Sequence, residues 1–271
     1  MWASSAGSAM SIDETHSSGS RPQSGDLSER DLARRLLAMM DLTSLNESDD
    51  TNSVRGLASR AATDSGRVAA LCIWPRFIAI ARTALLGKSI AIATVGNFPS
   101  GARDLDSVAA ETAASIASGA DEVDVVFPYR ALLSGDASTG LALVRACRAA
   151  CGERALLKVI LECGQLGSAD LIRRAAELAI EGGAHFLKTS TGKTTPGPTL
   201  QAASAMLDAI AAANARGVKV GFKVSGGVGT IAQAQAYLEL YERRFGVGSA
   251  TAASFRIGSS TLITPLLALL G

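Results

Sequence analysis

The chain has 271 residues, a length that single α/β barrels routinely reach. Hydrophobic residues make up 48% of it and aromatic residues only 4%, which favours a large core of small aliphatic side chains, as in helices packed on a parallel sheet. The 26 basic and 25 acidic residues leave a formal charge of +1, so the charge balance indicates neither nucleic acid nor an anionic membrane as a partner.

Residues 1–25 are rich in Ser and Gly and contain no hydrophobic run. They lack the basic start and apolar segment of a secretory signal, and Asp13 and Glu14 precede the first arginine, unlike in a mitochondrial transit peptide. We therefore expect residues 1–25 to be a disordered tail and residues 26–271 to form one folded domain. No window reaches the roughly 18 unbroken apolar residues of a membrane span, so a cytoplasmic protein without membrane contact is expected.

The four cysteines are not spaced like metal ligands. Cys147 and Cys151 are four residues apart on a predicted helix, a spacing that is more typical of packing than of zinc binding. Cys72 and Cys163 also lie in apolar surroundings. We expect four reduced thiols and no bound metal, and we note Cys72 because it ends a predicted strand.

Regular alternation of short and long segments begins near residue 26. Ser28 can cap a helix whose apolar side carries Leu32, Leu36, Leu37 and Met40. Short aliphatic runs predict strands at residues 40–42, 68–74, 90–95, 123–127, 156–161, 185–189, 218–223 and 255–257. Amphipathic runs predict helices at residues 53–62, 77–86, 105–118, 140–151, 169–181, 199–215, 231–244 and 261–270. This is the βα repeat of a closed parallel barrel, although an open doubly wound sheet has the same alternation.

The positions of polar and special residues favour the closed barrel. They lie at or near the carboxyl ends of the predicted strands, which converge on one mouth in a barrel but lie along a line in an open sheet. These residues are Asp41, Cys72, Asn97, Asp124, Glu162, Lys188, Lys223 and Gly258. We therefore predict an α/β fold, a (β/α)8 TIM barrel with an N-terminal capping helix.

Alternation along the strands predicts that Asp124, Lys158, Lys188 and Lys223 point into the barrel. Lys188 ends a short buried strand within residues 185–193, and hydroxyl side chains and a glycine follow it. An inert ion network explains one lysine and one acid but leaves surplus positive charge buried. Because crowded ammonium groups depress one another's pKa and a neutral amine is a nucleophile, the pattern indicates a reactive lysine.

Six segments of the chain resemble the 2-deoxyribose-5-phosphate aldolases, a family of class I, metal-independent enzymes, and the likeness runs from about residue 36 to residue 270. The segments are MDLT (40–43), CIWPRF (72–77), GADEVDVV (119–126), LKTSTGK (187–193), GFK (221–223) and GGV (226–228). The resemblance implies cleavage of 2-deoxy-D-ribose 5-phosphate into acetaldehyde and D-glyceraldehyde 3-phosphate, within deoxyribonucleotide and carbohydrate catabolism. It also implies that no cofactor is needed and that the protein is a homo-oligomer, a dimer or a tetramer.

The resemblance further implies a role for each matched residue. Lys188 would form the Schiff base, Lys223 would lower its pKa, and Asp124 would handle the proton of the C3 hydroxyl together with Lys223 and a water. Supporting positions in the same polar network would be Asp41, Thr43, Cys72 and Lys158. The phosphate of the substrate would meet Thr191, Gly192, Lys193, Gly226, Gly227, Gly258, Ser259 and Ser260. Glycine turns that lead into helices also expose backbone N–H groups to an anion, independently of the resemblance.

The chain differs from the family pattern in two places. We expect these differences to change catalytic efficiency and substrate affinity, while the Schiff-base residues are all present. Many members carry an arginine where Gly229 stands, and that side chain would contact the phosphate. Some members continue into a polar tail that ends in a tyrosine, whereas this chain stops at Leu270-Gly271.

Three other interpretations remain open on the sequence. The lysines could act on another phosphorylated sugar or a related acyl or keto substrate, because a barrel fixes no substrate. A weak or silent aldolase could instead bind another protein, with residues 1–25 as the docking segment. A sugar-phosphate sensor without turnover is the third.

Overall fold

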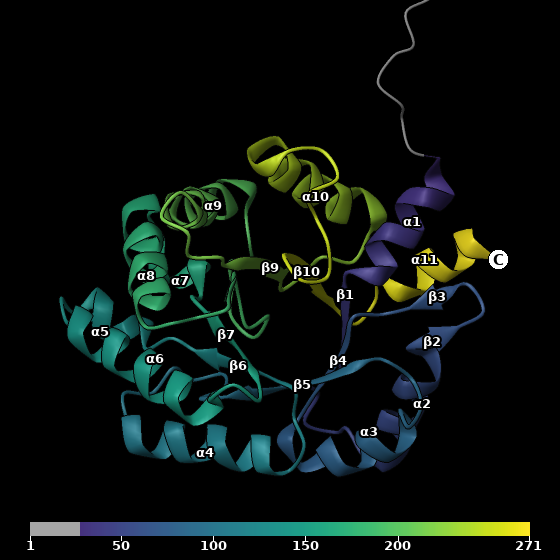
Figure 1. Cartoon of the computed structure of the whole chain (residues 1–271), viewed down its shortest axis with the longest axis horizontal. Helices are drawn as coiled ribbons and strands as arrows, with labels where there is room; N and C mark the ends of the chain where they lie inside the picture. The colour runs from purple at the N-terminus through teal and green to yellow at the C-terminus, as the bar shows by residue number, and fades with distance from the viewer. Residues whose placement is uncertain (1–27) are drawn as a thin grey trace, which may run out of the picture.

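Eight parallel strands close into a barrel in the computed structural model, which describes residues 28–271. The strand order is β1-β10-β9-β8-β7-β6-β5-β4, and β1 pairs with both β10 and β4. Helices surround the barrel as an outer layer (Figure 1). The predicted (β/α)8 TIM barrel is therefore confirmed and the open sheet is excluded, while the predicted tail, residues 1–25, lies outside the described residues.

All eight predicted strands are present, with shifts of a few residues at their ends. The largest shift is in β9, which starts at Gly221 rather than at residue 218, because Val218 lies half exposed in the turn after the preceding helix. The barrel strands are β1 (Met40–Thr43), β4 (Ala70–Ile73), β5 (Ala91–Gly96), β6 (Glu122–Val126), β7 (Leu156–Ile160), β8 (Phe186–Lys188), β9 (Gly221–Ser225) and β10 (Phe255–Ser259).

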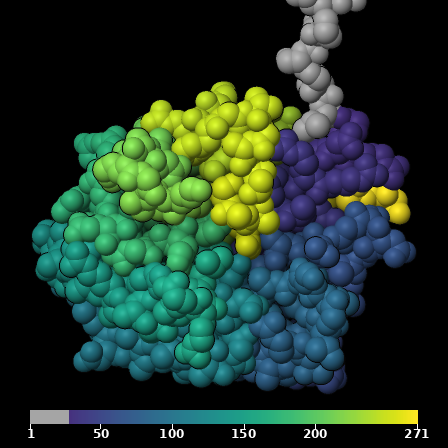
Figure 2. Space-filling model, in the orientation of Figure 1, coloured from purple at the N-terminus to yellow at the C-terminus, as the bar shows by residue number. Residues whose placement is uncertain are grey.

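The predicted helices are also present. Ser28 caps the first of them by accepting a hydrogen bond from the N–H of Asp31, as expected. They are α1 (Glu29–Ala38), α2 (Thr51–Arg60), α3 (Ile78–Ala84), α4 (Leu105–Ala117), α6 (Ala137–Cys151), α8 (Ala169–Glu181), α9 (Leu200–Asn214), α10 (Ile231–Phe245) and α11 (Ile263–Leu270). α1 packs beside α11, so the two ends of the described chain meet in the outer layer (Figure 2).

Several short elements lie between these helices and strands and were not predicted. They are the hairpin of β2 (Ala62–Thr63) and β3 (Gly66–Arg67), the 3-10 turn η1 (Pro75–Phe77), and the helices α5 (Tyr129–Leu133) and α7 (Cys163–Leu166). None is longer than five residues, which is too short for a hydrophobic period to show. Among the described residues, no helix is both long and apolar enough to cross a membrane.

The barrel interior is divided into an apolar side and a charged side. Inward positions of β4 and β5 carry Ala70, Cys72, Ala93 and Val95, which form a small apolar cluster separate from the main core. Inward positions of β1 and of β6 to β10 carry the charged side chains described below. Charge is therefore confined to one side of the barrel interior. The outward strand positions pack on the helices and form the main core.

Candidate active site

Three lysines from neighbouring strands converge on one carboxylate, that of Asp124 on β6. Lys158 Nζ lies 2.8 Å from Asp124 Oδ1, whereas Lys188 Nζ and Lys223 Nζ lie 2.8 Å and 2.7 Å from Oδ2. All four side chains are buried, Lys188 with 2% of its surface exposed. Strand pairing explains the convergence, because Asp124 pairs with Lys158 and Lys188 pairs with Lys223 in the barrel register.

Three further charged groups extend this network on the side away from Lys188. Asp41 Oδ2 accepts a hydrogen bond of 2.5 Å from Lys223, and its Oδ1 lies 2.6 Å from Arg256 Nη1. Arg256 also donates to both oxygens of Glu122, at 2.9 Å and 3.3 Å, and Glu122 contacts Lys158. The network therefore holds four cationic groups and three carboxylates.

Glu122 and Arg256 were not among the predicted site residues. Glu122 shares the inward face of Asp124, two residues before it, and Arg256 shares that of Gly258. The strand alternation that identified the lysines would also have found both residues. The predicted surplus of positive charge, three lysines against one aspartate, was therefore too large, because Asp41 and Glu122 add two carboxylates to the network.

Burial and neighbouring charges separate the pKa values of the three lysines. Burial lowers the pKa of Lys188, and the charge of Lys223 lowers it further, against the opposing effect of Asp124. Burial also acts on Lys158 and Lys223, but nearby carboxylates outweigh it and raise the pKa of both. The three ammonium groups hold the pKa of Asp124 well below its usual range in spite of its burial. Lys188 is therefore the lysine that most readily becomes neutral, chiefly through burial rather than through the predicted repulsion by Lys223.

Cys72 lies inside the barrel but belongs to its apolar cluster. Burial raises the pKa of its thiol, so Cys72 stays protonated and weakly nucleophilic. All four cysteines are free and buried. Among residues 28–271, no cluster of three or more His, Cys, Asp or Glu side chains has the arrangement to hold a metal ion.

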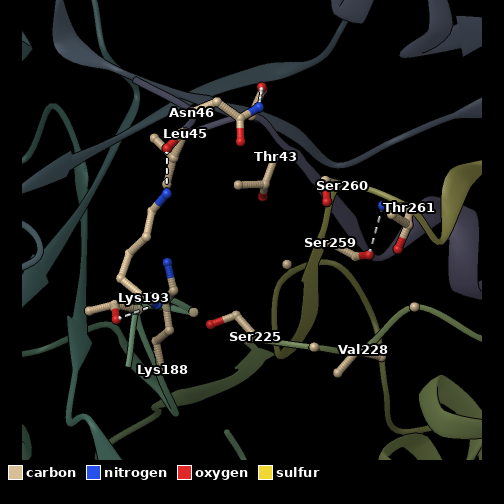
Figure 3. Close-up of a pocket in the computed structure, with 17 residues that line it drawn as sticks. Thr43, Leu45, Asn46, Lys188, Lys193, Ser225, Val228, Ser259, Ser260 and Thr261 are labelled. Carbon is tan, nitrogen blue, oxygen red and sulfur yellow. Dashed lines mark hydrogen bonds between the residues drawn. The ribbon is translucent and has the colours of Figure 1, made fainter. Parts of the chain in front are cut away.

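A pocket of about 270 Å³ opens over Lys188, between β8, β9, β10 and β1 (Figure 3). It brings together Thr43 and all eight residues that the resemblance assigns to the phosphate. Its lining is Thr43, Ser44, Leu45, Asn46, Lys188, Thr191, Gly192, Lys193, Ser225, Gly226, Gly227, Val228, Gly229, Gly258, Ser259, Ser260 and Thr261. Asp41, Asp124, Lys158 and Lys223 lie below the pocket, in the buried network.

Glycine is required at two places in this pocket. Gly226 and Gly227 have φ angles of +94° and +101°, which form the turn after β9. A Cβ atom at Gly258 would lie 3.0 Å from Cε of Lys223, so a side chain there would push against the lysine. These glycines therefore bring backbone close to the pocket without displacing the network.

The N-terminal end of α10, which was predicted to face an anion, is partly capped by side chains of the helix itself. The N–H groups of Gly229 and Thr230 both donate to Oε1 of Gln233, in the capping box of α10. The N–H of Gln233 is capped as well, by Oγ1 of Thr230, so the capping box already uses part of the donor set at this end of α10. Within residues 28–271, the N–H group of Gly227 has no protein acceptor, whereas that of Gly226 continues the ladder between β9 and β10.

The loop after β8 places a second amine at the rim of the pocket. Lys193 Nζ extends across the pocket and donates to the carbonyl oxygen of Leu45, at 2.7 Å (Figure 3). The loop is held by Glu162, whose Oε2 accepts the hydroxyl of Thr191 at 2.5 Å and whose Oε1 accepts its N–H at 3.2 Å. Glu162 is fully buried and has a left-handed backbone, with φ +57°, so this carboxylate faces the loop rather than the lysines.

The chain is similar to known aldolases in sequence and in structure. The family model described as "DeoC/LacD family aldolase" matches residues 35–246. A proposed deoxyribose-phosphate aldolase from Toxoplasma gondii ME49 superposes with a TM-score of 0.82 and 25% identity, over 89% of this chain and 94% of that one. A proposed deoxyribose-phosphate aldolase from Coccidioides immitis gives 0.75 and 27%, over 87% and 86%. The deoxyribose phosphate aldolase of Aeropyrum pernix gives 0.69 and 24%, over 88% and 91%, and supports the fold alone.

Proposed function

Because the chain belongs to the DeoC/LacD family of aldolases, we propose that it reversibly cleaves 2-deoxy-D-ribose 5-phosphate into acetaldehyde and D-glyceraldehyde 3-phosphate through a Schiff base on Lys188. The observation that carries the proposal is the state of Lys188. It is a buried amine with a lowered pKa at the floor of a pocket, and its one carboxylate contact is shared with two other lysines. An amine that loses its proton more readily than an ordinary lysine is the better nucleophile.

The proposed reaction begins when Lys188 Nζ attacks C1 of the open-chain sugar, and loss of water gives an iminium ion. The iminium takes up the electron pair of the C2–C3 bond while the C3 hydroxyl loses its proton. C3 then becomes the aldehyde carbon of glyceraldehyde 3-phosphate. The enamine left on Lys188 gains a proton at C2, and hydrolysis releases acetaldehyde and restores the amine.

Asp124 and Lys223 support the proton transfers in this scheme. The lowered pKa of Asp124 keeps it a carboxylate, and the raised pKa of Lys223 keeps it an ammonium group. Both are better suited to orient a water that carries the C3 proton than to hold that proton themselves. Asp41 fixes Lys223 from its other side, at 2.5 Å.

The phosphate end of the substrate is assigned to the outer part of the pocket. Lys193 supplies a cation there, and the N–H group of Gly227 has no other protein acceptor among residues 28–271. Hydroxyl groups of Ser259 and Ser260 line the same wall. Cationic, N–H and hydroxyl donors together suit a phosphate.

Reductive trapping tests the proposal directly. Acetaldehyde with borohydride should leave an ethyl group on the peptide that contains Lys188, and Lys188→Ala should abolish both the label and turnover. Release of glyceraldehyde 3-phosphate from the deoxysugar phosphate, followed by a coupled assay, tests the substrate. A label on Lys158 or Lys223 would overturn the assignment of the nucleophile. A labelled enzyme that does not cleave this sugar would overturn the assignment of the substrate.

A further inference from the structure

Two charged side chains of the network, Arg256 on β10 and Glu122 on β6, have no part in the proposed reaction. They are 6% and 2% exposed and do not line the pocket. Arg256 joins Glu122 to Asp41, and Glu122 in turn contacts Lys158. Since buried ion pairs of this kind are seldom worth their desolvation cost in stability alone, their presence under a reactive amine calls for a functional explanation.

We propose that Arg256 and Glu122 are positioning residues that set the net charge of the lysine network, so that Lys188, rather than Lys158 or Lys223, is the amine that reacts. The inference rests on the proposed function, in which Lys188 forms the Schiff base. It concerns how the network prepares that lysine and does not depend on which sugar is cleaved.

The contacts distribute the carboxylates unevenly among the lysines. Arg256 and Lys223 bind different oxygens of Asp41, so Lys223 is fixed between Asp41 and Asp124. Lys158 contacts three carboxylates, those of Glu122, Asp124 and Asp41, the last at 3.6 Å. Lys188 contacts Asp124 alone, through the oxygen that Lys223 also uses. Of the three lysines, Lys188 therefore has the fewest carboxylates to balance its positive charge.

The total charge then determines which proton leaves. A guanidinium group does not release its proton in proteins, so Arg256 is a permanent charge. With four cationic groups and three carboxylates, the excess of one is relieved when one lysine becomes neutral. The groups that face the network are Asp41 (β1), Cys72 (β4), Glu122 and Asp124 (β6), Lys158 (β7), Lys188 (β8), Lys223 (β9) and Arg256 (β10), while β5 presents only the apolar Ala93 and Val95.

The test measures the initial rate of reductive labelling of Lys188 by acetaldehyde as a function of pH, in the full chain, by mass spectrometry of its peptide. Because the reagents respond to pH identically in every sample, the ratio of variant to wild type at each pH isolates the change at Lys188. Arg256→Met removes a cation and should raise the pH midpoint. Glu122→Gln removes an anion with little change of shape and should lower it. Each shift should be on the order of one pH unit, the scale of one charge in a partly buried network.

Two controls separate charge from structure. Arg256→Lys keeps the positive charge but loses the bidentate contact with Glu122. The pH midpoint for labelling of Lys188 should therefore stay near that of wild type, even if the maximal rate falls. Arg145→Met removes a cation from an exposed ion pair with Glu181 on the helical surface, and should also leave the midpoint unmoved. A purely structural role for Arg256 predicts a lower melting temperature in Arg256→Met and Arg256→Lys alike, with no shift of the midpoint.

The outcomes are distinct. Folded Arg256→Met and Glu122→Gln proteins with wild-type midpoints, or with midpoints that move in the same direction, overturn the inference. If Arg256→Met does not fold, the near-isosteric Glu122→Gln decides alone. A wild-type midpoint at or above about 10.4, the value of an ordinary lysine, overturns the inference without any variant. Absence of any adduct on Lys188 in the wild type would instead contradict the proposed function.

Discussion

At the scale of single residues, Gly229 leaves an open position at the end of the pocket to which we assign the phosphate. Its φ angle is not in the left-handed region, so the turn does not require glycine there. A Cβ atom at this position would have one close neighbour, the hydroxyl oxygen of Thr261 at 3.0 Å, on a side chain that can rotate. Within residues 28–271 the cations that line the pocket are Lys188 and Lys193, so an added arginine would strengthen a weakly cationic site.

Gly229→Arg should improve kcat/KM for the phosphorylated sugar. A hydrogen bond to a charged group is worth roughly 1.5–3 kcal/mol, which corresponds to about ten- to a hundredfold in binding. The gain should appear mainly in KM, because a remote phosphate is bound similarly in the ground state and the transition state. Steady-state kinetics on both 2-deoxyribose 5-phosphate and free 2-deoxyribose make the comparison.

Free 2-deoxyribose is the internal control for this variant, since it has no phosphate to bind. It should gain nothing from the arginine. Equal gains for both sugars in a variant that melts like wild type would show that the phosphate lies elsewhere.

At the scale of elements, the loop between β8 and α9 depends on one buried carboxylate from the end of β7. Glu162 binds Thr191 through both its hydroxyl and its N–H, and Thr191 Oγ1 accepts the N–H of Lys193 at 3.0 Å. Lys193 then reaches back to Leu45 on the loop after β1. The rim of the pocket is thus held by a series of hydrogen bonds that begins at Glu162, at a distance from the lysine network.

Glu162→Gln should loosen this rim while leaving the chemistry at Lys188 largely intact. The amide keeps one acceptor oxygen but loses the charge that strengthens the bond to the Thr191 hydroxyl. We expect KM for the phosphorylated sugar to rise by about tenfold, the scale of one charge-assisted hydrogen bond, with a smaller fall in kcat. Glu177→Gln, at an exposed position of α8, is the matched control. A Glu162→Gln enzyme that loses kcat at unchanged KM would place Glu162 in the reaction rather than in the rim.

The strands and most helices could be predicted because their hydrophobic periods extend over enough residues. The period of two along β6, β7, β8 and β9 also identified which charged side chains face inward. The short elements α5 and α7 were missed because four or five residues show no period. The prediction that the sheet closes into a barrel came from the clustering of polar residues at strand ends rather than from the pattern of any single strand.

The site could be predicted only in part, because one of its features is a contact between residues far apart in sequence and another is a backbone conformation with no sequence signal. Glu122 and Arg256 lie 134 residues apart in sequence, and only closure of the barrel shows that each binds the other. The left-handed backbone of Glu162 likewise has no signature in its flanking residues. By contrast, Lys188, Thr191, Gly192 and Lys193 follow one another closely in the chain, and the pocket brings all four together.

At the scale of the whole molecule, the network links stability to pH in two separate ranges, one acidic and one alkaline, and in both of them stability rises with pH. The pKa values of Asp41 and Asp124 are depressed in the folded state, so their contribution to stability is present above their unfolded pKa of about 3.9 and is lost as pH falls below it. The pKa of Lys188 is also lowered, which for a cation means that the folded state disfavours its proton. Lys188 therefore costs stability, and that cost decreases as pH rises toward the unfolded lysine pKa of about 10.4.

Lys188→Met should accordingly stabilise the protein while abolishing its activity. Methionine is of similar length and suits a buried site, and Asp124 keeps Lys158 and Lys223 as partners. We expect the melting temperature near pH 7 to rise by roughly 2–4 °C, about 1 kcal/mol for a chain of this length, as for other substitutions that remove a functional group kept at a cost to stability. The gain should shrink between pH 7 and pH 10, because the unfolded lysine then loses its proton as well. Lys88→Met, at an exposed position, should change the melting temperature little at any pH. A Lys188→Met protein that melts below wild type across this range would show that Lys188 holds the network together, and that its amine is not kept at a cost to stability.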